Sequence, residues 1–252
     1  MYFDSHVHLN SEQLYKDRDL FIANALENGV ANMLVVGYDM ESSKLAVELA
    51  NSYEFLYAAV AIGPNDCNET TMEDMHVLEK YLDDPKVVAI GETGLDYYWD
   101  HVAASKQKEV FQWHIDMAKK HNMPLSIHCR DAYEDTYSML KQASHFGVMH
   151  CYSGSAQMAQ RFVDIGFKIS LAGTVTFKNA RVPKEVAGHI QIENLLIETD
   201  CPYLTPHPFR GKLNEPANVI YVAKEIAKIK NLEIEDVGSI TEFNAKKLFG
   251  IK

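Results

Sequence analysis

Short apolar runs alternate along the chain with longer amphipathic stretches. The short runs are rich in β-branched residues and lack polar alternation, as expected for strands that are buried on both faces of a parallel sheet. We predict eight strands from them: Tyr2–Val7, Ala31–Gly37, Leu56–Ile62, Val87–Glu92, Leu125–Cys129, Val148–Cys151, Phe167–Leu171 and Leu195–Thr199.

The longer stretches carry apolar residues at helical spacing, which is typical of helices that bury one face. Two end signals accompany them. Asp131, with Glu134 three residues later, predicts a capping box for a helix that follows the fifth strand. Gly250 is placed as the residue that terminates the last helix. The clearest predicted helices are Leu20–Leu26, Leu45–Ala50, Met75–Leu82, Gln107–Lys119 and Glu242–Phe249.

Alternating strands and helices indicate parallel pairing, because a parallel return needs a crossover connection. Eight such units in 252 residues match a (β/α)₈ TIM-type barrel. We therefore expect one α/β barrel domain spanning residues 1–252. A doubly wound open sheet is the alternative, but the glycine-rich phosphate turn that would favour it does not follow the first strand.

Composition narrows the class of protein. A formal net charge of −11 argues against a protein that wraps duplex DNA through many phosphate contacts, although it leaves room for a small local site. The N-terminal residues lack the features of a signal peptide, and no apolar stretch is long enough to span a bilayer. The four cysteines show no CxxC spacing. We expect a cytoplasmic protein with reduced thiols, no membrane association, and a monomeric or weakly oligomeric state.

Ionisable residues stand at the carboxyl ends of several predicted strands, where parallel barrels build their active sites. His6 and His8 are two residues apart and so project from the same face of the first strand. Each group alone has an ordinary explanation, such as a hydrogen-bonded core histidine or a buried ion pair. Together they are expected to converge on one mouth: His6, His8, Glu92, His128, His150 and Asp200.

Four imidazoles and two carboxylates form a mixed nitrogen and oxygen donor set. Such a set suits Zn, Mn, Fe, Co or Ni better than Mg or Ca. Six donors exceed the four that a structural zinc takes, whereas two ions bridged by a carboxylate would use them all. The residues therefore predict a metal centre with paired divalent ions.

Five short motifs contain the six predicted ligand residues, and two more follow them along the chain: Asp4–Leu9, Gly91–Tyr97, His128–Ala132, His150–Ser155, Glu198–Leu204, Asn214–Pro216 and Asn244–Gly250. In these motifs the chain resembles the TatD-like metal-dependent hydrolases (the TatD DNase family, with an amidohydrolase-like barrel) over nearly its whole length. It departs from the family pattern at two positions: Leu213 replaces the usual Arg before Asn-Glu-Pro, and Tyr152 replaces a Phe.

The resemblance implies a deoxyribonuclease that trims DNA from 3′ to 5′, with two divalent ions (Zn, Mn, Mg, Co or Ni) as cofactors. By this resemblance His6, His8, Glu92 and Asp200 would hold one ion. Glu92, His128 and His150 would hold the other. The implied substrate is single-stranded DNA or another nucleic-acid end.

We expect Asp200 and Glu92 to be the catalytic residues, with Asp200 as the general base toward a metal-activated water. Arg130 and Asn214 are the expected substrate contacts. The aromatic run Tyr97–Trp99 would either stack a base or cover the barrel as a lid. Two other functions stay open: a metal-dependent amide or ester hydrolase, such as an aminoacyl-tRNA deacylase, and a non-catalytic metal-binding barrel.

Overall fold

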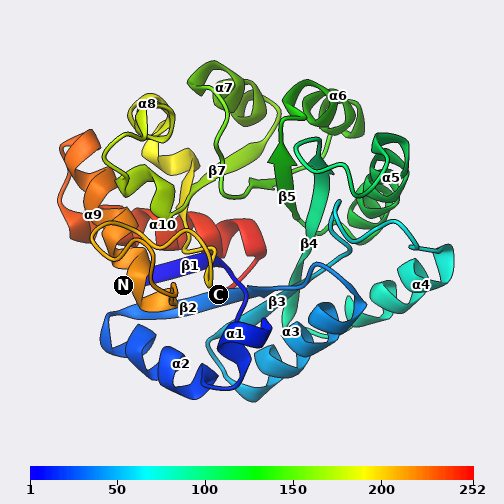
Figure 1. The fold of residues 1–252 in the computed structure, drawn as a ribbon, viewed down its shortest axis with the longest axis horizontal. Coiled ribbons are helices and arrows are strands. Elements are labelled where there is room, and N and C mark those ends of the chain that lie inside the picture. Colours follow the sequence, from blue (N-terminus) through cyan, green and yellow to red (C-terminus); the bar gives the residue numbers. More distant parts are fainter.

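The computed structural model describes residues 1–252 and contains one sheet of eight parallel strands, paired in sequence order from β1 to β8 (Figure 1). The strands are β1 (Tyr2–Val7), β2 (Val30–Val36), β3 (Leu56–Val60), β4 (Val87–Asp96), β5 (Leu125–Arg130), β6 (Gly147–Met149), β7 (Phe167–Leu171) and β8 (Leu195–Ile197).

Ten α-helices and three short 3₁₀ helices connect and flank the strands, and most of the α-helices form an outer ring (Figure 1). The α-helices are α1 (Glu12–Tyr15), α2 (Arg18–Glu27), α3 (Met40–Ser52), α4 (Met72–Tyr81), α5 (Ala104–His121), α6 (Tyr133–Ala143), α7 (Ala156–Asp164), α8 (Arg181–His189), α9 (Val219–Lys230) and α10 (Ile234–Phe249). The 3₁₀ helices are η1 (Gly173–Thr176), η2 (Ile192–Asn194) and η3 (Pro216–Asn218).

The sheet closes where β1 meets the segment after β8. Val7 forms a parallel bridge with Cys201. The backbone N–H of His8 donates to the carbonyl of Cys201 (2.9 Å), and the N–H of Asp200 donates to the carbonyl of His6 (3.0 Å). These bonds make the sheet a nearly closed barrel, and they place Asp200 beside the end of β1. The predicted TIM-type fold is confirmed.

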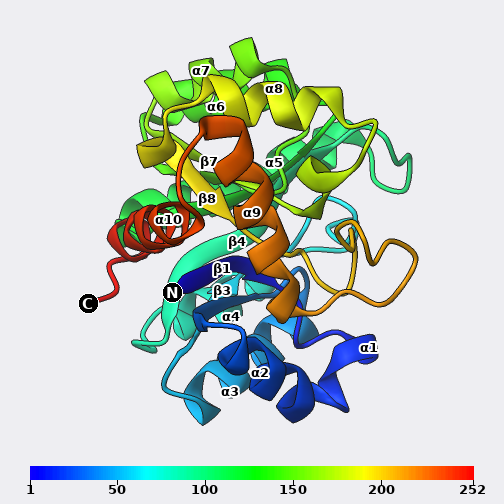
Figure 2. The same ribbon diagram turned by 90° about the vertical axis from the view of Figure 1, so that its left-hand side faces the viewer.

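The barrel interior is packed at the end where the strands begin. Inward-facing apolar side chains from β1, β2, β3, β4, β6 and β8 form one cluster with Ala245 and Phe249 of α10. The Phe3 and Phe249 rings lie 5.9 Å apart, so α10 plugs this end (Figure 2). The polar residues at the other ends of the strands therefore form the floor of the open mouth.

All eight predicted strands are present, and their ends differ by a few residues. The largest difference is in β4, which continues to Asp96, four residues beyond the predicted end at Glu92. The last helix starts at Ile234, eight residues before the predicted start, and Gly250 terminates it in the left-handed conformation (φ 68°). The predicted capping box is wrong: α6 follows β5, but its N-cap is Ala132, and no side chain caps the helix.

The four cysteines are free thiols. Cys67 and Cys201 are buried, whereas Cys129 and Cys151 are partly exposed at the mouth of the barrel. None of the helices combines the length and the apolar composition that crossing a bilayer requires.

Candidate metal centre

A register shift in β1 directs its two histidines into the barrel. β1 advances three positions from Asp4 to Val7, while β2 advances only two, from Met33 to Val35. The extra residue changes the phase of the strand, as a β-bulge does. As a result Phe3 faces the packed interior, and His6 and His8 still face inward at the mouth, where both are buried.

A second register shift, in β4, directs Glu92 into the mouth. β4 advances from Ile90 to Thr93 while β5 advances only from Leu125 to Ile127. The shift falls at Gly91 and Glu92, so the carboxylate leaves the regular alternation of the strand. The adjacent Gly91 permits close approach to β5, because a Cβ there would lie 2.5 Å from the Cβ of Ser126.

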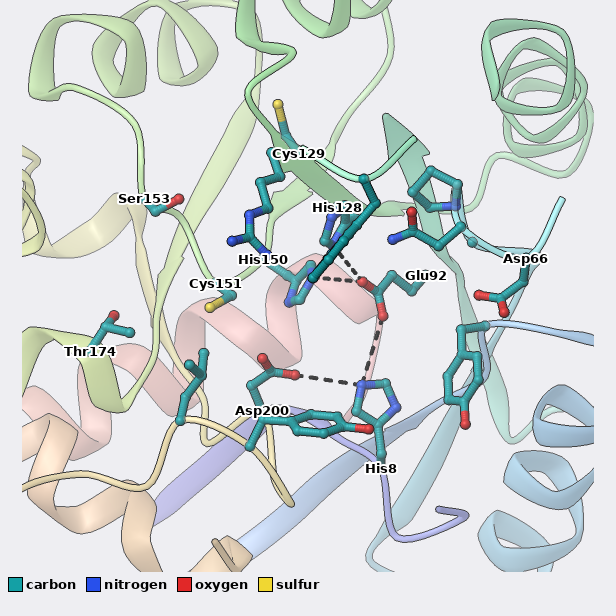
Figure 3. Close-up of a pocket in the computed structure, with 18 of the residues that line it drawn as sticks. His8, Asp66, Glu92, His128, Cys129, His150, Cys151, Ser153, Thr174 and Asp200 are labelled. Atoms are coloured by element: carbon teal, nitrogen blue, oxygen red, sulfur yellow. Dashed lines mark hydrogen bonds and ion pairs between the residues drawn. The ribbon is translucent and has the colours of Figure 1, made fainter. Parts of the chain in front are cut away.

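Glu92 lies between the imidazoles of His8, His128 and His150 (Figure 3), and the imidazole of His6 also faces its carboxylate. Its Oε1 lies 2.8 Å from His128 Nδ1 and 3.0 Å from His150 Nε2. Its Oε2 lies 3.5 Å from His6 Nε2 and 3.7 Å from His8 Nε2. One carboxylate thus faces both pairs of histidines, which is the arrangement that a ligand shared by two ions needs.

Asp200 completes the cluster from the segment after β8. Its Oδ1 lies 3.5 Å from His8 Nε2 and 4.0 Å from His6 Nε2, and its other oxygen points into the cavity (Figure 3). The residue has a left-handed backbone (φ 55°), which is unfavourable for a side chain of this kind outside turns and functional sites. The structure therefore brings all six predicted ligand residues together.

Hydrogen bonds to the outer ring nitrogens orient three of the imidazoles. His8 Nδ1 faces the carbonyl of Val36 at 3.0 Å. His128 Nε2 bonds to Asp96 at 2.8 Å, and His150 Nδ1 bonds to Glu198 at 3.2 Å. Each of these acceptors binds the ring proton, so the nitrogen that faces the cluster presents its lone pair. Imidazoles that bind metal are usually held in this way.

The donor chemistry fits divalent ions. With neutral imidazoles, lone pairs of His128 and His150 would face lone pairs of Glu92 at 2.8 and 3.0 Å, which is repulsive unless a proton or a cation intervenes. Three groups have donor atoms within 4.8 Å of one another: His6, His8 and Glu92; Glu92, His128 and His150; and His6, His150 and Glu198. The first two correspond to the predicted ligand sets. Nitrogen and oxygen donors at this density are suited to first-row divalent metals.

The pKa directions show that protons can take the place of such ions. Burial alone would lower the pKa of His128, but its hydrogen bonds to Asp96 and Glu92 raise it to about 9. Burial alone would raise the pKa of Glu92, but the neighbouring histidines hold it well below the usual value. In Asp200 the effect of burial is likewise outweighed by His8 and the other imidazoles, which lower its pKa. Metal binding would displace the imidazole protons.

Five of the six residues, all except His6, border a cavity of about 820 Å³ at the mouth of the barrel. Arg130 lines it from the end of β5, and its guanidinium carbon lies 3.6 Å from the centre of the Tyr98 ring. Trp99 also lines the cavity and is 44 % exposed. Arg130 therefore lies over one face of Tyr98, and its guanidinium carbon is also 5.7 Å from the centre of the Trp99 ring.

Asn214, the other predicted substrate contact, does not line this cavity. The side chain is fully buried, and its amide donates to the carbonyls of Thr199 (3.0 Å) and Tyr203 (2.6 Å). It holds the loop after β8 together. His114 of α5 is also fully buried and accepts a hydrogen bond from the N–H of Ile62 at 3.1 Å.

Asp96 and Glu198 are the site residues that sequence reasoning missed. Both are buried carboxylates that contact a histidine of the cluster and not the cavity. Asp96 stands four residues after Glu92 and Glu198 two residues before Asp200, within the motifs already quoted. The sequence did contain a signal for them: each is an acidic residue within a few positions of a predicted metal ligand, in a segment that is mostly apolar.

Comparison with known proteins identifies relatives over the full chain. Residues 3–250 match the family model described as TatD related DNase. The chain is 47 % identical to a Bacillus subtilis protein, named as an uncharacterized metal-dependent hydrolase YabD, over 100 % of both chains. It is 32 % identical to a Citrobacter koseri protein named 3′-5′ ssDNA/RNA exonuclease TatD, over 99 % of both chains.

A solved structure agrees with the fold. The structure of the TatD homologue YjjV from Escherichia coli superposes with a TM-score of 0.95 at 27 % identity, covering 100 % of this chain and 98 % of the other. The matched model spans almost all residues, and the metal-binding chemistry of the barrel mouth agrees with the names of its relatives. The chain belongs to the TatD related DNase family of metal-dependent hydrolases.

Proposed function

We propose that this protein is a nuclease that hydrolyses phosphodiester bonds at the ends of single-stranded DNA. The single observation that carries the proposal is the position of Asp200. Its carboxylate belongs to the donor cluster through Oδ1 and still directs the other oxygen into the cavity (Figure 3). A group held in this way can both help to bind an ion and accept a proton from a water molecule.

Two divalent ions fit the donor set. His6, His8, Glu92 and Asp200 would hold one, and Glu92, His128 and His150 the other. When bound, the ions would lower the pKa of a water molecule and neutralise charge on the phosphoryl oxygens. Asp96 and Glu198 would keep His128 and His150 oriented toward the ions.

Asp200 would act as the general base. The imidazoles around it hold its pKa below the usual value, so it is ionised at neutral pH and can accept a proton. Its backbone is fixed by the hydrogen bond from its N–H to the carbonyl of His6, which limits the motion of the carboxylate. The proton would move from the attacking water to the free oxygen of Asp200.

Arg130 would bind a phosphate oxygen of the substrate. It lines the cavity, has no carboxylate within ion-pair distance, and is held against Tyr98. A guanidinium without an acidic partner is well suited to a phosphate group. The cavity volume of about 820 Å³ accommodates a ligand of one or two nucleotides, which favours a strand end over the interior of a duplex.

The names of relatives support a nucleic-acid substrate and a direction of cleavage. The Citrobacter koseri relative is named a 3′-5′ exonuclease of single-stranded DNA and RNA. We extend this activity to the present chain as part of the proposal, because the two sequences align over nearly their full lengths.

The test uses metal-loaded protein and single-stranded DNA labelled at its 5′ end. We expect a ladder of shortened labelled products that a chelator abolishes. Asp200→Asn should reduce the rate by at least about 100-fold, as expected for loss of a general base. Metal content measured on the same sample separates this effect from loss of an ion.

A parallel panel of acyl esters, including an aminoacyl-tRNA, tests the other hydrolase function. Faster turnover of an acyl ester than of any phosphodiester would overturn the proposal. Near-normal DNA cleavage by Asp200→Asn with unchanged metal content would overturn the role of Asp200.

A further inference from the structure

The mouth of the barrel is electrostatically uneven. The loops after β2 and β3 place Asp39 and Asp66 on one side, and residues 37–39 and 61–71 contain no Lys or Arg. The loops after β7 and β8 place Lys178, Arg210 and Lys212 on another side, and residues 172–180 and 205–214 contain no Asp or Glu. We call these three cations the basic rim. They are conspicuous in a protein with a net charge of −11.

The three cations of the basic rim are exposed and form no ion pair. The Arg210 guanidinium lies 4.0 Å from the centre of the Phe177 ring, and Lys212 Nζ lies 5.7 Å from that of Phe209. Neither contact neutralises charge. By contrast, the nearby Arg181 and Lys184 are paired with Glu185 and Glu225. The unpaired charges of the rim therefore remain available to an anion.

The two loops of the rim are held together by short contacts. The N–H of His207 donates to Thr176 Oγ1 at 2.8 Å, and a Cβ on Gly173 would lie 2.1 Å from the carbonyl oxygen of Leu204. Thr205 Oγ1 donates to the carbonyl of Lys212 at 2.6 Å. Cations carried on a fixed backbone lose less conformational freedom when they bind a ligand.

The basic rim adjoins the catalytic cavity, because Thr174 and Leu204 of the same two loops line that cavity. In Figure 2 the loop after β8 projects on the side of the molecule away from α10, as expected for a loop of the mouth. A chain of phosphates whose end occupies the cavity would meet cations on this side and carboxylates on the side of β2 and β3. The charge pattern thus favours a path in which the rest of the strand leaves the cavity over the basic rim and not over Asp39 and Asp66.

We propose that the basic rim binds the phosphate backbone of a single-stranded nucleic acid, a few nucleotides away from the bond being cut. The inference rests on the proposed nuclease function and specifies its substrate as an oligonucleotide instead of an isolated phosphodiester. Both DNA and RNA share this backbone, and the contacts carry no base sequence information.

The test compares two triple variants with three charges removed from each. Lys178→Gln/Arg210→Gln/Lys212→Gln removes the basic rim. Lys119→Gln/Lys247→Gln/Lys252→Gln is the matched control, because these exposed lysines also form no ion pair and lie toward the opposite end of the barrel. Binding of fluorescent 12-nucleotide DNA and RNA is measured by anisotropy in the Asp200→Asn background, which prevents cleavage. Thermal melting confirms that both variants are folded.

We expect the rim variant to bind both 12-mers about 10-fold more weakly at low salt. The slope of log Kd against log salt concentration should fall by about 2, since each lost contact to a single strand contributes about 0.7. The control should bind within about twofold of the parent. Arg210→Lys, which keeps the charge, should retain binding, whereas Arg210→Glu should weaken it further.

Unchanged 12-mer binding by the rim variant, or an equal loss in the control, would overturn the inference. Hydrolysis of a dinucleotide, measured with Asp200 intact, separates the two proposals. If the rim variant and the parent cleave the dinucleotide equally well and also bind the 12-mers equally well, the inference about the rim is wrong and the proposed nuclease function stands. If no phosphodiester is cleaved although binding depends on the rim, the proposed function fails alone.

Discussion

Asp96 and Glu198 show how buried carboxylates outside the cavity control the candidate metal centre. Asp96 accepts hydrogen bonds from Asn65 (3.2 Å) and from the backbone N–H of Tyr98 (3.0 Å) as well as from His128. Glu198 is fully buried, and its Oε2 has no hydrogen-bond partner. The two carboxylates set the ring orientation of His128 and His150, and so the direction in which their lone pairs point.

Glu198→Gln should weaken metal binding by about 10- to 100-fold, because the amide keeps the shape but holds the His150 proton less strongly. The measurement is metal retained after dialysis against a competing chelator. Glu134→Gln is the control, since Glu134 is an exposed carboxylate paired with Arg161 on the outer helices. Equal metal retention in Glu198→Gln and the parent would contradict the orienting role of Glu198.

His114 should make the protein less stable in mild acid. Burial lowers its pKa to about 4, whereas the unfolded chain keeps a value near 6.5. The unfolded state therefore binds a proton that the native state excludes as the pH falls from about 6.5 to 4, and stability falls over that window. The shift in the pKa of His114 corresponds to a decrease on the order of 3 kcal/mol in the free energy of unfolding.

Urea unfolding of the parent and of His114→Gln at pH 7 and pH 4.5 tests this prediction. The other titrating groups are common to both proteins and cancel in the comparison. The free energy of unfolding should fall more steeply with acid in the parent. Parallel losses in the two proteins would show that His114 does not contribute.

At the scale of single elements, β4 is the strand that shapes the site. Its register shift directs Glu92 inward, and its extension beyond Glu92 pairs with β5 as far as Asp96 and Arg130. Gly94 makes the extension possible. Its φ is +142°, and a Cβ there would lie 2.0 Å from the carbonyl oxygen of His128. The strand therefore needs glycine at this point both for its backbone and for contact with β5.

Gly94→Ala should lower the free energy of unfolding by at least about 2 kcal/mol and should also reduce metal retention, because relief of the clash displaces His128. Denaturant unfolding and metal analysis are the measurements. Gly250→Ala is the control: its φ is also positive (68°), but nothing lies within 4 Å of the added Cβ. A Gly94→Ala protein with the stability and metal content of the parent would contradict the need for glycine.

At the scale of the whole molecule, the packed core and the polar mouth are separate layers of one barrel. One cluster of 56 buried residues joins the strands to the surrounding helices, and the inner cluster with α10 closes the far end. The hydrophobic packing at the start of the strands and around the barrel is built without the side chains that would hold the ions. We therefore expect the barrel to fold without the ions.

Removal of metal should abolish hydrolysis and leave the barrel folded. Protons on the imidazoles can balance Glu92 when ions are absent, as the raised pKa of His128 indicates. We expect the far-ultraviolet circular dichroism of the chelated protein to match the loaded protein, with a lower Tm because bound ions stabilise the native state. Unfolding on chelation would instead indicate a structural metal site and favour the non-catalytic barrel.

Local sequence patterns were enough to predict the barrel and most of the candidate site. Hydrophobic periodicity is local, so eight strands and their order could be read from it, and parallel strands bring their carboxyl ends to one mouth. That rule alone placed His6, Glu92 and Asp200 together although they are far apart in the chain.

Contacts between distant segments set the details of the site that local patterns do not predict. The register shifts of β1 and β4, the contacts of Asp96 and Glu198, and the burial of Asn214 and His114 depend on which neighbour each residue meets. The basic rim likewise exists because two loops pack together at the mouth. Packing between segments distant in sequence leaves little trace in local spacing, so these features became visible only in three dimensions.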